Sequence, residues 1–444
     1  MNKKRLISDY HSIEDSLKRK AVVFLFDNMA EHTSDIPGNI WYRRLPDSEI
    51  LDNEFLTDDI DLAFRLWNKY PWADSVPVDI FMNYLLPYKV YGEEPSNWRS
   101  FFHQKYKDSL VSFMKTYSTD DIKISNNLYY VILVDEVGSW FKYSSTSSFK
   151  ARHPGLNELM ETKSADCYGW SYLNVMILRS LGIPSAIDFL PLWGRKNGSH
   201  YTEVFWDNKE QKFRTASGRE LYSPEHSLYP AKVFRFTYKN QSLWKDSIAP
   251  HTGQEPFVLE CLKNNHLKDV TDEHAQTATI DIRLNTTSDF AYICVFNYGE
   301  WHPVYWGRKQ DDNTFRFENM GVNVMYRIAV PKGSGYEIAS PIFICDSTGN
   351  HIHFSPCYDQ KIEMSISKLN TGKQSWVEKG KIYGFYYLDE KSDWRLLNEQ
   401  SSPADSTIIF ENAPSGTLYL LQDKDATRRL ARPFTYDNGK QIFW

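Results

Sequence analysis

The sequence is poor in cysteine, and its five cysteines are widely spaced. They are Cys167, Cys261, Cys294, Cys345 and Cys357. An odd number of cysteines without a Cys-x-x-Cys pair is not a disulfide framework, so we expect at least one free thiol. The pattern therefore argues against a small secreted fold that is held together by disulfides.

Long apolar runs and a surplus of positive charge are also missing. No apolar run approaches the ~18–20 residues of a membrane span, so we expect none. Lys and Arg number 51 and Asp and Glu 57, which gives a net charge of −6. A nucleic-acid surface would need a basic patch, so nucleic acid is not expected as a partner. With 41% hydrophobic and 24% charged residues, the chain is not predominantly disordered.

A complete secretory signal is not found either. Residues 1–5, MNKKR, resemble the basic start of such a signal, but the polar residues 8–11 follow where an apolar stretch is required. We expect either a cytoplasmic protein or the mature form of an exported protein, in the periplasm or at the cell surface.

The common cofactor and metal motifs are absent. The sequence has no phosphate-binding loop, no dinucleotide fingerprint, no HExxH and no GxSxG. His351 and His353 share one face of a predicted strand, and Cys357 follows. A zinc site would need a fourth ligand and a standard spacing, so we interpret these residues as an exposed strand face. No cofactor and no metal are expected.

Aromatic residues are abundant, with 14 Trp, 28 Tyr and 26 Phe. Such a load usually fills β-sandwich cores or lines grooves for sugars and peptides.

The first 110 residues have apolar residues at helical spacing, as in Leu17, Ala21 and Phe24. From about residue 249 the period changes to two, which predicts half-buried strands, for example over 279–284.

The C-terminal part also contains an internal repeat. Residues 314–319, TFRFEN, match residues 407–412, TIIFEN, 93 positions later. Trp301 matches Trp394, and Tyr326 matches Tyr419, at the same spacing. The repeat predicts two tandem all-β domains, each a sandwich. We therefore expect an α+β chain with a helical N-terminal region (1–110), a core (111–248) and β-sandwich domains at 249–362 and 363–444.

One cysteine lies at the predicted start of a helix. Cys167 follows Asp166, and the helix ends at Gly182. The partial positive charge at a helix N-terminus lowers the pKa of a thiol, and the thiolate is the nucleophile. Taken alone, the position fits a small buried apolar cysteine equally well.

About 30 residues later, a histidine opens a strand. Residues 183–192 are predicted as a strand, residues 195–199 as a polar loop, and His200 begins the strand over 201–206. A single histidine at a strand edge is usually an ordinary polar residue. Together with Cys167, His200 has the arrangement of a Cys–His nucleophile pair.

These segments resemble the core of the transglutaminase-like superfamily, specifically over about 160–220. The resemblance rests on Asp166-Cys167, on RSLGIPS at 179–185 and on GSH at 198–200. Bacterial multidomain members have a helical N-terminal region and C-terminal β-sandwiches, which this chain resembles more loosely. The resemblance implies a papain-like fold for the core, with Cys167 as nucleophile and His200 as general base. It also implies a hydrolase or acyl-transfer activity on peptide or isopeptide-type bonds of a peptide, a protein or a peptidoglycan-like substrate, with a glycan as a further candidate partner.

The third member of the family's triad, an Asp on the next strand, has no clear counterpart. Asp207 lies seven residues along the same strand, ~23 Å from His200, and is better suited to start a turn. If the chain folds back there, residues 216–218 lie beside His200, and none of them is a carboxylate. We expect Ser217 to act weakly in place of the Asp, with Thr215 as another hydroxyl, because a hydroxyl does not stabilise an imidazolium as a carboxylate does.

Two functions stay open on the sequence. The first is a thiol acyl-transfer or amide-hydrolysing protein with an incomplete triad. The second is a non-catalytic binding or scaffold protein that presents aromatic surfaces to glycans, peptides or a partner protein.

Overall fold

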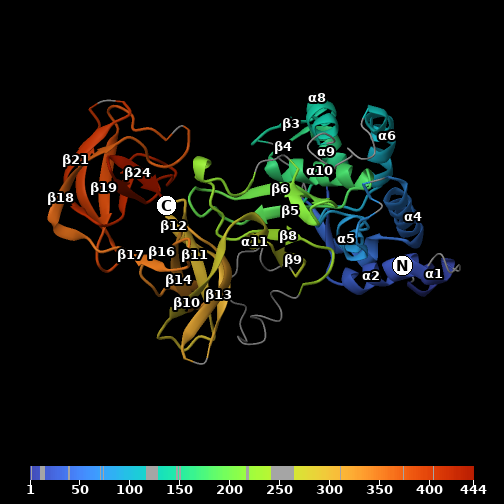
Figure 1. The fold of residues 1–444 in the computed structure, drawn as a ribbon, viewed down its shortest axis with the longest axis horizontal. Helices are drawn as coiled ribbons and strands as arrows, with labels where there is room; N and C mark the ends of the chain where they lie inside the picture. Colours follow the sequence, from blue (N-terminus) through green and yellow to red (C-terminus); the bar gives the residue numbers. More distant parts are fainter. Residues whose placement is uncertain are drawn as a thin grey trace.

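The computed structural model describes residues 1–444 except 2, 11–15, 39–40, 71, 74, 117–128, 147–148, 150–151, 217–219, 242–264, 311, 374 and 404. Figure 1 shows the helices and the N-terminus at one end of the molecule and β-rich units at the other. The central sheet of the chain lies between these two ends (Figure 1).

The N-terminal region is mainly helical, as the sequence predicts. Helix α4 begins after Asp52, whose carboxylate accepts a hydrogen bond from the Phe55 N–H, and Leu56, Ile60 and Ala63 of this helix are buried. One antiparallel hairpin, β1–β2, was not expected from the sequence. The elements are α1 (Lys3–Asp9), α2 (Ser16–Met29), β1 (Thr33–Ile36), β2 (Arg43–Pro46), α3 (Asp47–Ile50), α4 (Asn53–Lys69), α5 (Val78–Tyr84) and α6 (Trp98–Thr116).

A five-stranded antiparallel sheet and helix α10 form the core. The strand order is β7-β6-β5-β8-β9. Helix α10 is buried from Ser171 to Ser180, and Leu173 and Ile177 share one hydrophobic cluster with Phe189 of the sheet. The elements are η1 (Tyr129–Val137), α8 (Gly138–Trp140), β3 (Lys142–Tyr143), β4 (Ser164–Ala165), α9 (Leu156–Thr162), α10 (Cys167–Ser180), β5 (Ser185–Leu190), β6 (His200–Asp207), β7 (Lys212–Thr215), η2 (Pro224–His226), β8 (Phe234–Phe236), β9 (Leu267–Asp269) and α11 (Thr271–His274).

The first C-terminal unit is an antiparallel sheet in the order β10-β13-β12-β11-β14-β16-β17, with β15 paired to β14. Every residue of β11 is buried, because one face of the strand, with Tyr292, packs into the hydrophobic cluster of the core and the other face, with Ile293, packs into the cluster of this unit. The strands are β10 (Thr277–Arg283), β11 (Phe290–Asn297), β12 (Glu300–Lys309), β13 (Thr314–Gly321), β14 (Val324–Lys332), β15 (Gly335–Ile338), β16 (Phe343–Cys345) and β17 (His351–His353).

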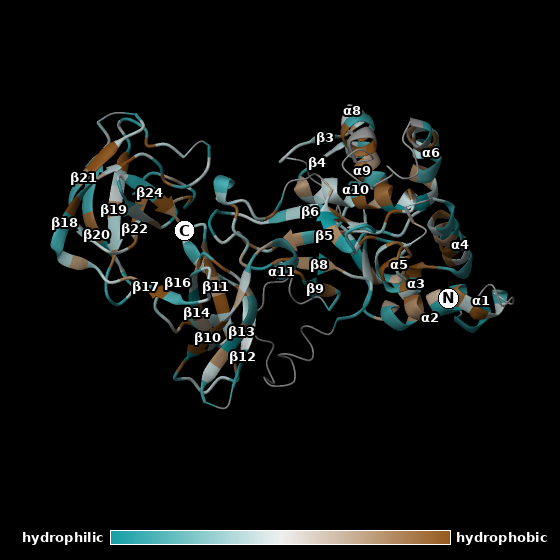
Figure 2. Ribbon diagram, viewed as in Figure 1, coloured by the Kyte–Doolittle hydropathy of each residue, from teal (hydrophilic) through white to brown (hydrophobic). Residues whose placement is uncertain are grey.

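The second C-terminal unit consists of two facing sheets, β18-β21 and β20-β19-β22-β23-β24. Met364 and Phe410 of the smaller sheet pack against Phe385 and Tyr419 of the larger one in a single hydrophobic cluster. Figure 2 shows hydrophobic and hydrophilic residues alternating along strands of these C-terminal sheets. The strands are β18 (Cys357–Ile366), β19 (Ile382–Leu388), β20 (Trp394–Ser401), β21 (Ile408–Ser415), β22 (Tyr419–Asp423), β23 (Phe434–Asp437) and β24 (Lys440–Phe443).

The two C-terminal units share their topology. When β10 is matched with β18 and β13 with β21, the other strands follow in the same order, β12-β11-β14-β16-β17 and β20-β19-β22-β23-β24. The Tyr326 hydroxyl donates to the Gly321 carbonyl at 2.7 Å, and the Tyr419 hydroxyl donates to the Pro414 carbonyl at 2.5 Å. The sequence repeat thus reappears both in strand order and in a local hydrogen bond, which supports the predicted duplication.

A buried arginine joins the second C-terminal unit to the rest of the chain. Arg432 is fully buried and donates from one guanidinium nitrogen to the carbonyls of Gly194 and Trp444, at 2.6 Å each. It also donates to the Phe296 carbonyl in the first C-terminal unit. Because these acceptors come from three parts of the chain, Arg432 fixes their mutual arrangement.

Two of the three predicted domain boundaries fall inside regular secondary structure. Residue 110 lies inside helix α6, and residue 362 lies inside strand β18. The boundary at 248–249 lies outside the described residues. Strand β9, which follows that boundary, completes the core sheet by pairing with β8.

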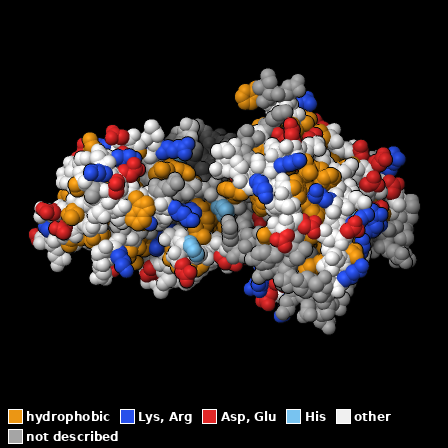
Figure 3. Space-filling model, turned by 90° about the horizontal axis from the view of Figure 1, so that it is seen from above, with side chains coloured by type: hydrophobic (Ala, Val, Ile, Leu, Met, Phe, Trp, Pro, Cys, Tyr) orange, Lys and Arg blue, Asp and Glu red, His pale blue; other side chains and the backbone are white. Residues whose placement is uncertain are grey.

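The surface of the molecule is mixed. Figure 3 shows charged, polar and hydrophobic side chains interspersed over the viewed face. Among the described residues, none of the helices has the length and apolar character that crossing a membrane requires.

The two matched tyrosines allow a direct test of the duplication. Tyr326→Phe and Tyr419→Phe should each lower the free energy of unfolding by about 1–3 kcal/mol, because each removes the hydroxyl that satisfies a carbonyl five residues upstream. Urea unfolding measures the loss. Tyr358→Phe, at a 44% exposed site, serves as the control. A loss at only one of the two tyrosines would show that the two units do not use the same contact.

Candidate functional site

Helix α10 begins at Cys167, as the sequence predicts. The Asp166 carboxylate caps the helix by accepting hydrogen bonds from the N–H groups of Tyr168 at 3.0 Å and Gly169 at 3.2 Å. Asp166 thereby satisfies two of the free N–H groups of the first turn, and it also brings a negative charge next to the thiol.

The surroundings of the Cys167 thiol do not favour the thiolate. The thiol is half-buried, and burial is the largest influence on its pKa, which it raises. A hydrogen bond from the Tyr201 backbone lowers the pKa, and the charge of Asp166 raises it again. None of these groups is an imidazole, and the net effect is a pKa above the ordinary thiol value.

Side chains alternate between the two faces of the core sheet along β6. The Tyr201 ring lies 4.4 Å from the Tyr168 ring of α10, and Ser171 of α10 donates to Glu203 at 3.3 Å. Phe205 joins the same hydrophobic cluster as α10. The odd-numbered residues of β6 therefore face α10, and the even-numbered residues face the other side.

His200 lies on that other side. It pairs with Leu190 on β5, and its ring stacks on the Trp193 ring with the centroids 6.0 Å apart. Trp193 packs with Leu190 and Val233 in a small hydrophobic cluster that includes no residue of α10. Cys167 thus reaches the backbone of β6 next to His200, while the alternation of the strand directs the imidazole to the opposite face.

The third predicted site residue, Ser217, lies outside the described residues. The hairpin before it turns at Asp207, as predicted, because Asp207 accepts hydrogen bonds from the N–H groups of Lys209 and Glu210. Val204 pairs with Thr215. Ala216, one of the residues expected beside His200, instead donates from its N–H to the Glu203 carbonyl at 3.1 Å, because the hairpin loop is longer than expected.

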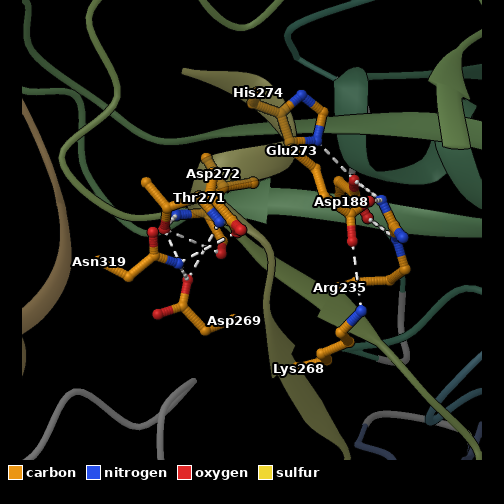
Figure 4. Close-up of polar contacts among 10 residues, drawn as sticks. Asp188, Arg235, Lys268, Asp269, Thr271, Asp272, Glu273, His274 and Asn319 are labelled. Atoms are coloured by element: carbon orange, nitrogen blue, oxygen red, sulfur yellow. Dashed lines mark hydrogen bonds and ion pairs between the residues drawn. The ribbon is translucent and has the colours of Figure 1, made fainter. Parts of the chain in front are cut away.

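Figure 4 shows a charge network around Asp188 that the sequence did not reveal. Asp188 pairs with Thr202, an even-numbered residue of β6, so it lies on the face of the core sheet turned away from α10. The Asp188 carboxylate receives two hydrogen bonds of 2.7 Å from Arg235 and one of 2.6 Å from His274. Arg235 also pairs with Glu273 at 2.7 Å, and Glu273 with Lys268 at 3.2 Å. Helix α11 is attached to the sheet through this network.

The network determines the protonation of Asp188. Burial by itself raises the pKa of Asp188, but the charge of Arg235 and the hydrogen bond from His274 outweigh it, so the pKa lies below the ordinary value. Asp188, the one charged residue in strand 185–190, was the signal that could have identified this site from the sequence.

A second histidine that the sequence reasoning missed packs against α10. The Nδ1 atom of His153 is hydrogen-bonded to the Tyr168 hydroxyl and, at 3.1 Å, to the Tyr172 hydroxyl. Burial, followed by the charges of Arg152 and Arg44, holds the pKa of His153 well below its ordinary value. A buried, neutral imidazole with phenol partners is a structural element of the helix packing.

Among the described residues, no group of three or more His, Cys, Asp and Glu side chains is arranged to hold a metal ion. His351 and His353 both lie beside the Phe343 ring, at centroid distances of 4.8 and 6.2 Å.

One family model of known proteins matches part of the core. Residues 124–213 match the family model of the transglutaminase-like superfamily. The matched segment includes α10, β5 and β6, so the predicted resemblance is confirmed: this core is transglutaminase-like. A search of curated proteins gave no match. Among solved structures, red sea bream transglutaminase is similar at 10% identity and a TM-score of 0.20, covering 92% of this chain and 76% of that chain.

Two Asp–Arg pairs with the same cross-strand geometry differ in burial and provide a matched test. Asp188 lies opposite Arg235 in the buried network, and Asp281 lies opposite Arg316 on an exposed surface. Asp188→Asn should lower the free energy of unfolding by up to about 3–5 kcal/mol, because it removes the carboxylate that accepts two hydrogen bonds from a buried guanidinium and leaves the more exposed Glu273 as its ion-pair partner. Asp281→Asn should cost at most about 1 kcal/mol. Urea unfolding measures both, and equal costs would contradict the structural role of Asp188.

The same variant has a predicted pH dependence. Because the folded-state pKa of Asp188 is lowered, its stabilising contribution is complete above the unfolded-state value of about 3.9 and disappears as the pH falls through the folded-state value. The stability difference between the wild type and Asp188→Asn should therefore shrink below about pH 4. A difference that stays constant into that range would contradict the lowered pKa.

Proposed function

We propose that this chain is a binding protein whose transglutaminase-like core keeps its shape without turning over amide bonds. The observation that carries the proposal is the alternation along β6, in which Tyr201 and Glu203 contact α10 while His200 stacks on Trp193. A general base must come within hydrogen-bond reach of the proton that it removes. An imidazole on the opposite face of the strand does not meet that requirement.

The electrostatics of Cys167 support the same conclusion. A catalytic thiol needs a lowered pKa, because the thiolate is the nucleophile. Burial and Asp166 instead raise the pKa of Cys167, and the helix N-terminus, whose N–H groups bind Asp166, does not offset them. At neutral pH the thiol is then protonated.

The carboxylates of the core sheet give no further support for a triad. Asp188 lies on the same face as His200, but it pairs across the strands with Thr202, whereas His200 pairs with Leu190. Both oxygens of Asp188 are bound by Arg235, and one of them is also bound by His274. This carboxylate serves the attachment of α11.

A thiol acyl-transfer function is the second candidate, because Cys167 opens a capped helix and is only half-buried. In that reaction the Cys167 sulfur would attack an amide carbon, His200 would pass the thiol proton to the leaving amine, and water or an amine would release the acyl group from the thioester. Ser217, in place of the family's Asp, belongs to this candidate.

Labelling of each cysteine with iodoacetamide, followed by mass spectrometry, separates the two candidates. We expect Cys167 to react more slowly than N-acetylcysteine at neutral pH, because its pKa is raised. The half-exposed Cys357 serves as the internal reference. His200→Ala should leave the rate at Cys167 unchanged.

Fast labelling of Cys167 would support the acyl-transfer candidate. If Cys167 reacts faster than N-acetylcysteine, and His200→Ala slows it, the Cys–His pair is operating. Release of ammonia from a glutamine peptide, absent in Cys167→Ala, would then establish the acyl-transfer function. Cys167→Ala is a usable control because removing a half-buried thiol should cost about 1 kcal/mol or less.

A further inference from the structure

A groove of about 750 Å³ lies on the second C-terminal unit, far along the chain from Cys167. The segment before β19 and the loop after β22 form most of its walls. Its size falls within the range of about 300–1,000 Å³ that is usual for ligand sites. Its lining includes Asn370, Trp376, Lys381, Gln422, Asp423 and Arg428.

An exposed indole forms one wall. Trp376 lines the groove and is 45% exposed. The Lys368 ammonium lies 4.2 Å from the centre of the Trp376 ring, and Lys368 is not part of the lining. The ammonium therefore packs on the Trp376 ring from a position outside the groove and stabilises the orientation of the ring. The exposed part of the ring remains on the groove side.

The charges in the groove are largely balanced among themselves. Lys381 pairs with Asp423 at 3.2 Å and with Glu378 at 3.0 Å. Lys424 pairs with Glu399 at 3.0 Å. Asp425 and Arg428 also line the groove, have no ion pair among the described residues and carry opposite charges. A groove with balanced charges does not select strongly for an anion or a cation.

Unused hydrogen-bonding capacity remains in the groove. Within the described part of the chain, the side-chain amide of Gln422, the indole N–H of Trp376 and the guanidinium of Arg428 have no hydrogen-bond partner. These groups border the same groove and offer both donors and an acceptor. They suit a ligand with many hydroxyl groups.

The walls are held in position before any ligand binds. The Asn370 amide donates to the Leu430 carbonyl at 2.9 Å, and it accepts from the Gly372 N–H at 2.6 Å. Asn197, from the core, donates to the same Leu430 carbonyl at 2.9 Å. A preformed groove loses little conformational freedom on binding.

From these features together, we propose that the groove binds a neutral oligosaccharide. The Trp376 ring packs on the apolar face of a sugar ring, and Gln422 and Arg428 bind its hydroxyl groups. The inference does not depend on the proposed lack of amide turnover, because no group of the Cys167 site takes part in it.

Affinity electrophoresis of the full chain tests this proposal. The protein is run in native gels that contain xylan, galactomannan or hydroxyethylcellulose as neutral polysaccharides, or alginate as an acidic one. We expect at least one neutral polysaccharide to slow the wild type. Trp376→Ala should weaken that binding by at least about tenfold. Gln422→Ala, which removes only an amide, should weaken it as well.

Trp41→Ala is the matched control, because Trp41 is 79% exposed and lies outside the groove. It should bind like the wild type. If none of the three neutral polysaccharides slows the protein, if alginate alone does, or if Trp376→Ala and Gln422→Ala both bind as the wild type does, the proposal is overturned. Far-UV circular dichroism checks that each variant is folded. A reactive Cys167 in the labelling experiment would leave this result unaffected.

Discussion

The packing of α10 against one face of the core sheet is the constraint on which the site depends. Once Tyr201 and Glu203 contact the helix, the two-residue period of the strand directs His200 to the other face. There its ring stacks on Trp193, which packs in a cluster with Leu190 and Val233. Moving the imidazole to the helix face would require a shift of one residue along β6, which would also expose Phe205 and Tyr201 to the wrong side. The core therefore cannot keep its hydrophobic packing and at the same time turn the His200 imidazole toward Cys167.

The face of the core sheet turned away from α10 binds the segment that leads to the first C-terminal unit. Asp188, Arg235 and His274 form a buried network there that binds α11, the short helix between the core and the first C-terminal unit. Arg432 makes a comparable connection farther along the chain, through carbonyl oxygens of the core and of the first C-terminal unit. Both arginines are buried, so a change at either affects how parts of the molecule are joined as well as local stability. Such fixed arrangements keep the surfaces of the joined units in a constant relation.

The sequence predicted those features that depend on local patterns. The start of α10 followed from Asp166 and Cys167, the turn at Asp207 from its polar residues, and the tandem C-terminal units from the repeat at 93 residues. The orientation of His200 could not be predicted, because it depends on which face of β6 packs against the helix, and Tyr201 and Thr202 are both compatible with either face. The register of the hairpin also differed, since its loop is longer than a minimal turn. The role of Asp188 depends on partners that lie 47 and 86 residues away in the sequence.

The most direct test of the central claim is the titration of the His200 imidazole by NMR, in the wild type and in Cys167→Ala. A thiol and an imidazole that act as a nucleophile pair titrate together, so removing the thiol would move the midpoint for His200 by about one pH unit or more. The structure predicts the same midpoint in both proteins, because the thiol contacts the Tyr201 backbone and the imidazole faces Trp193. A midpoint that moves by about one unit when Cys167 is replaced would contradict this account.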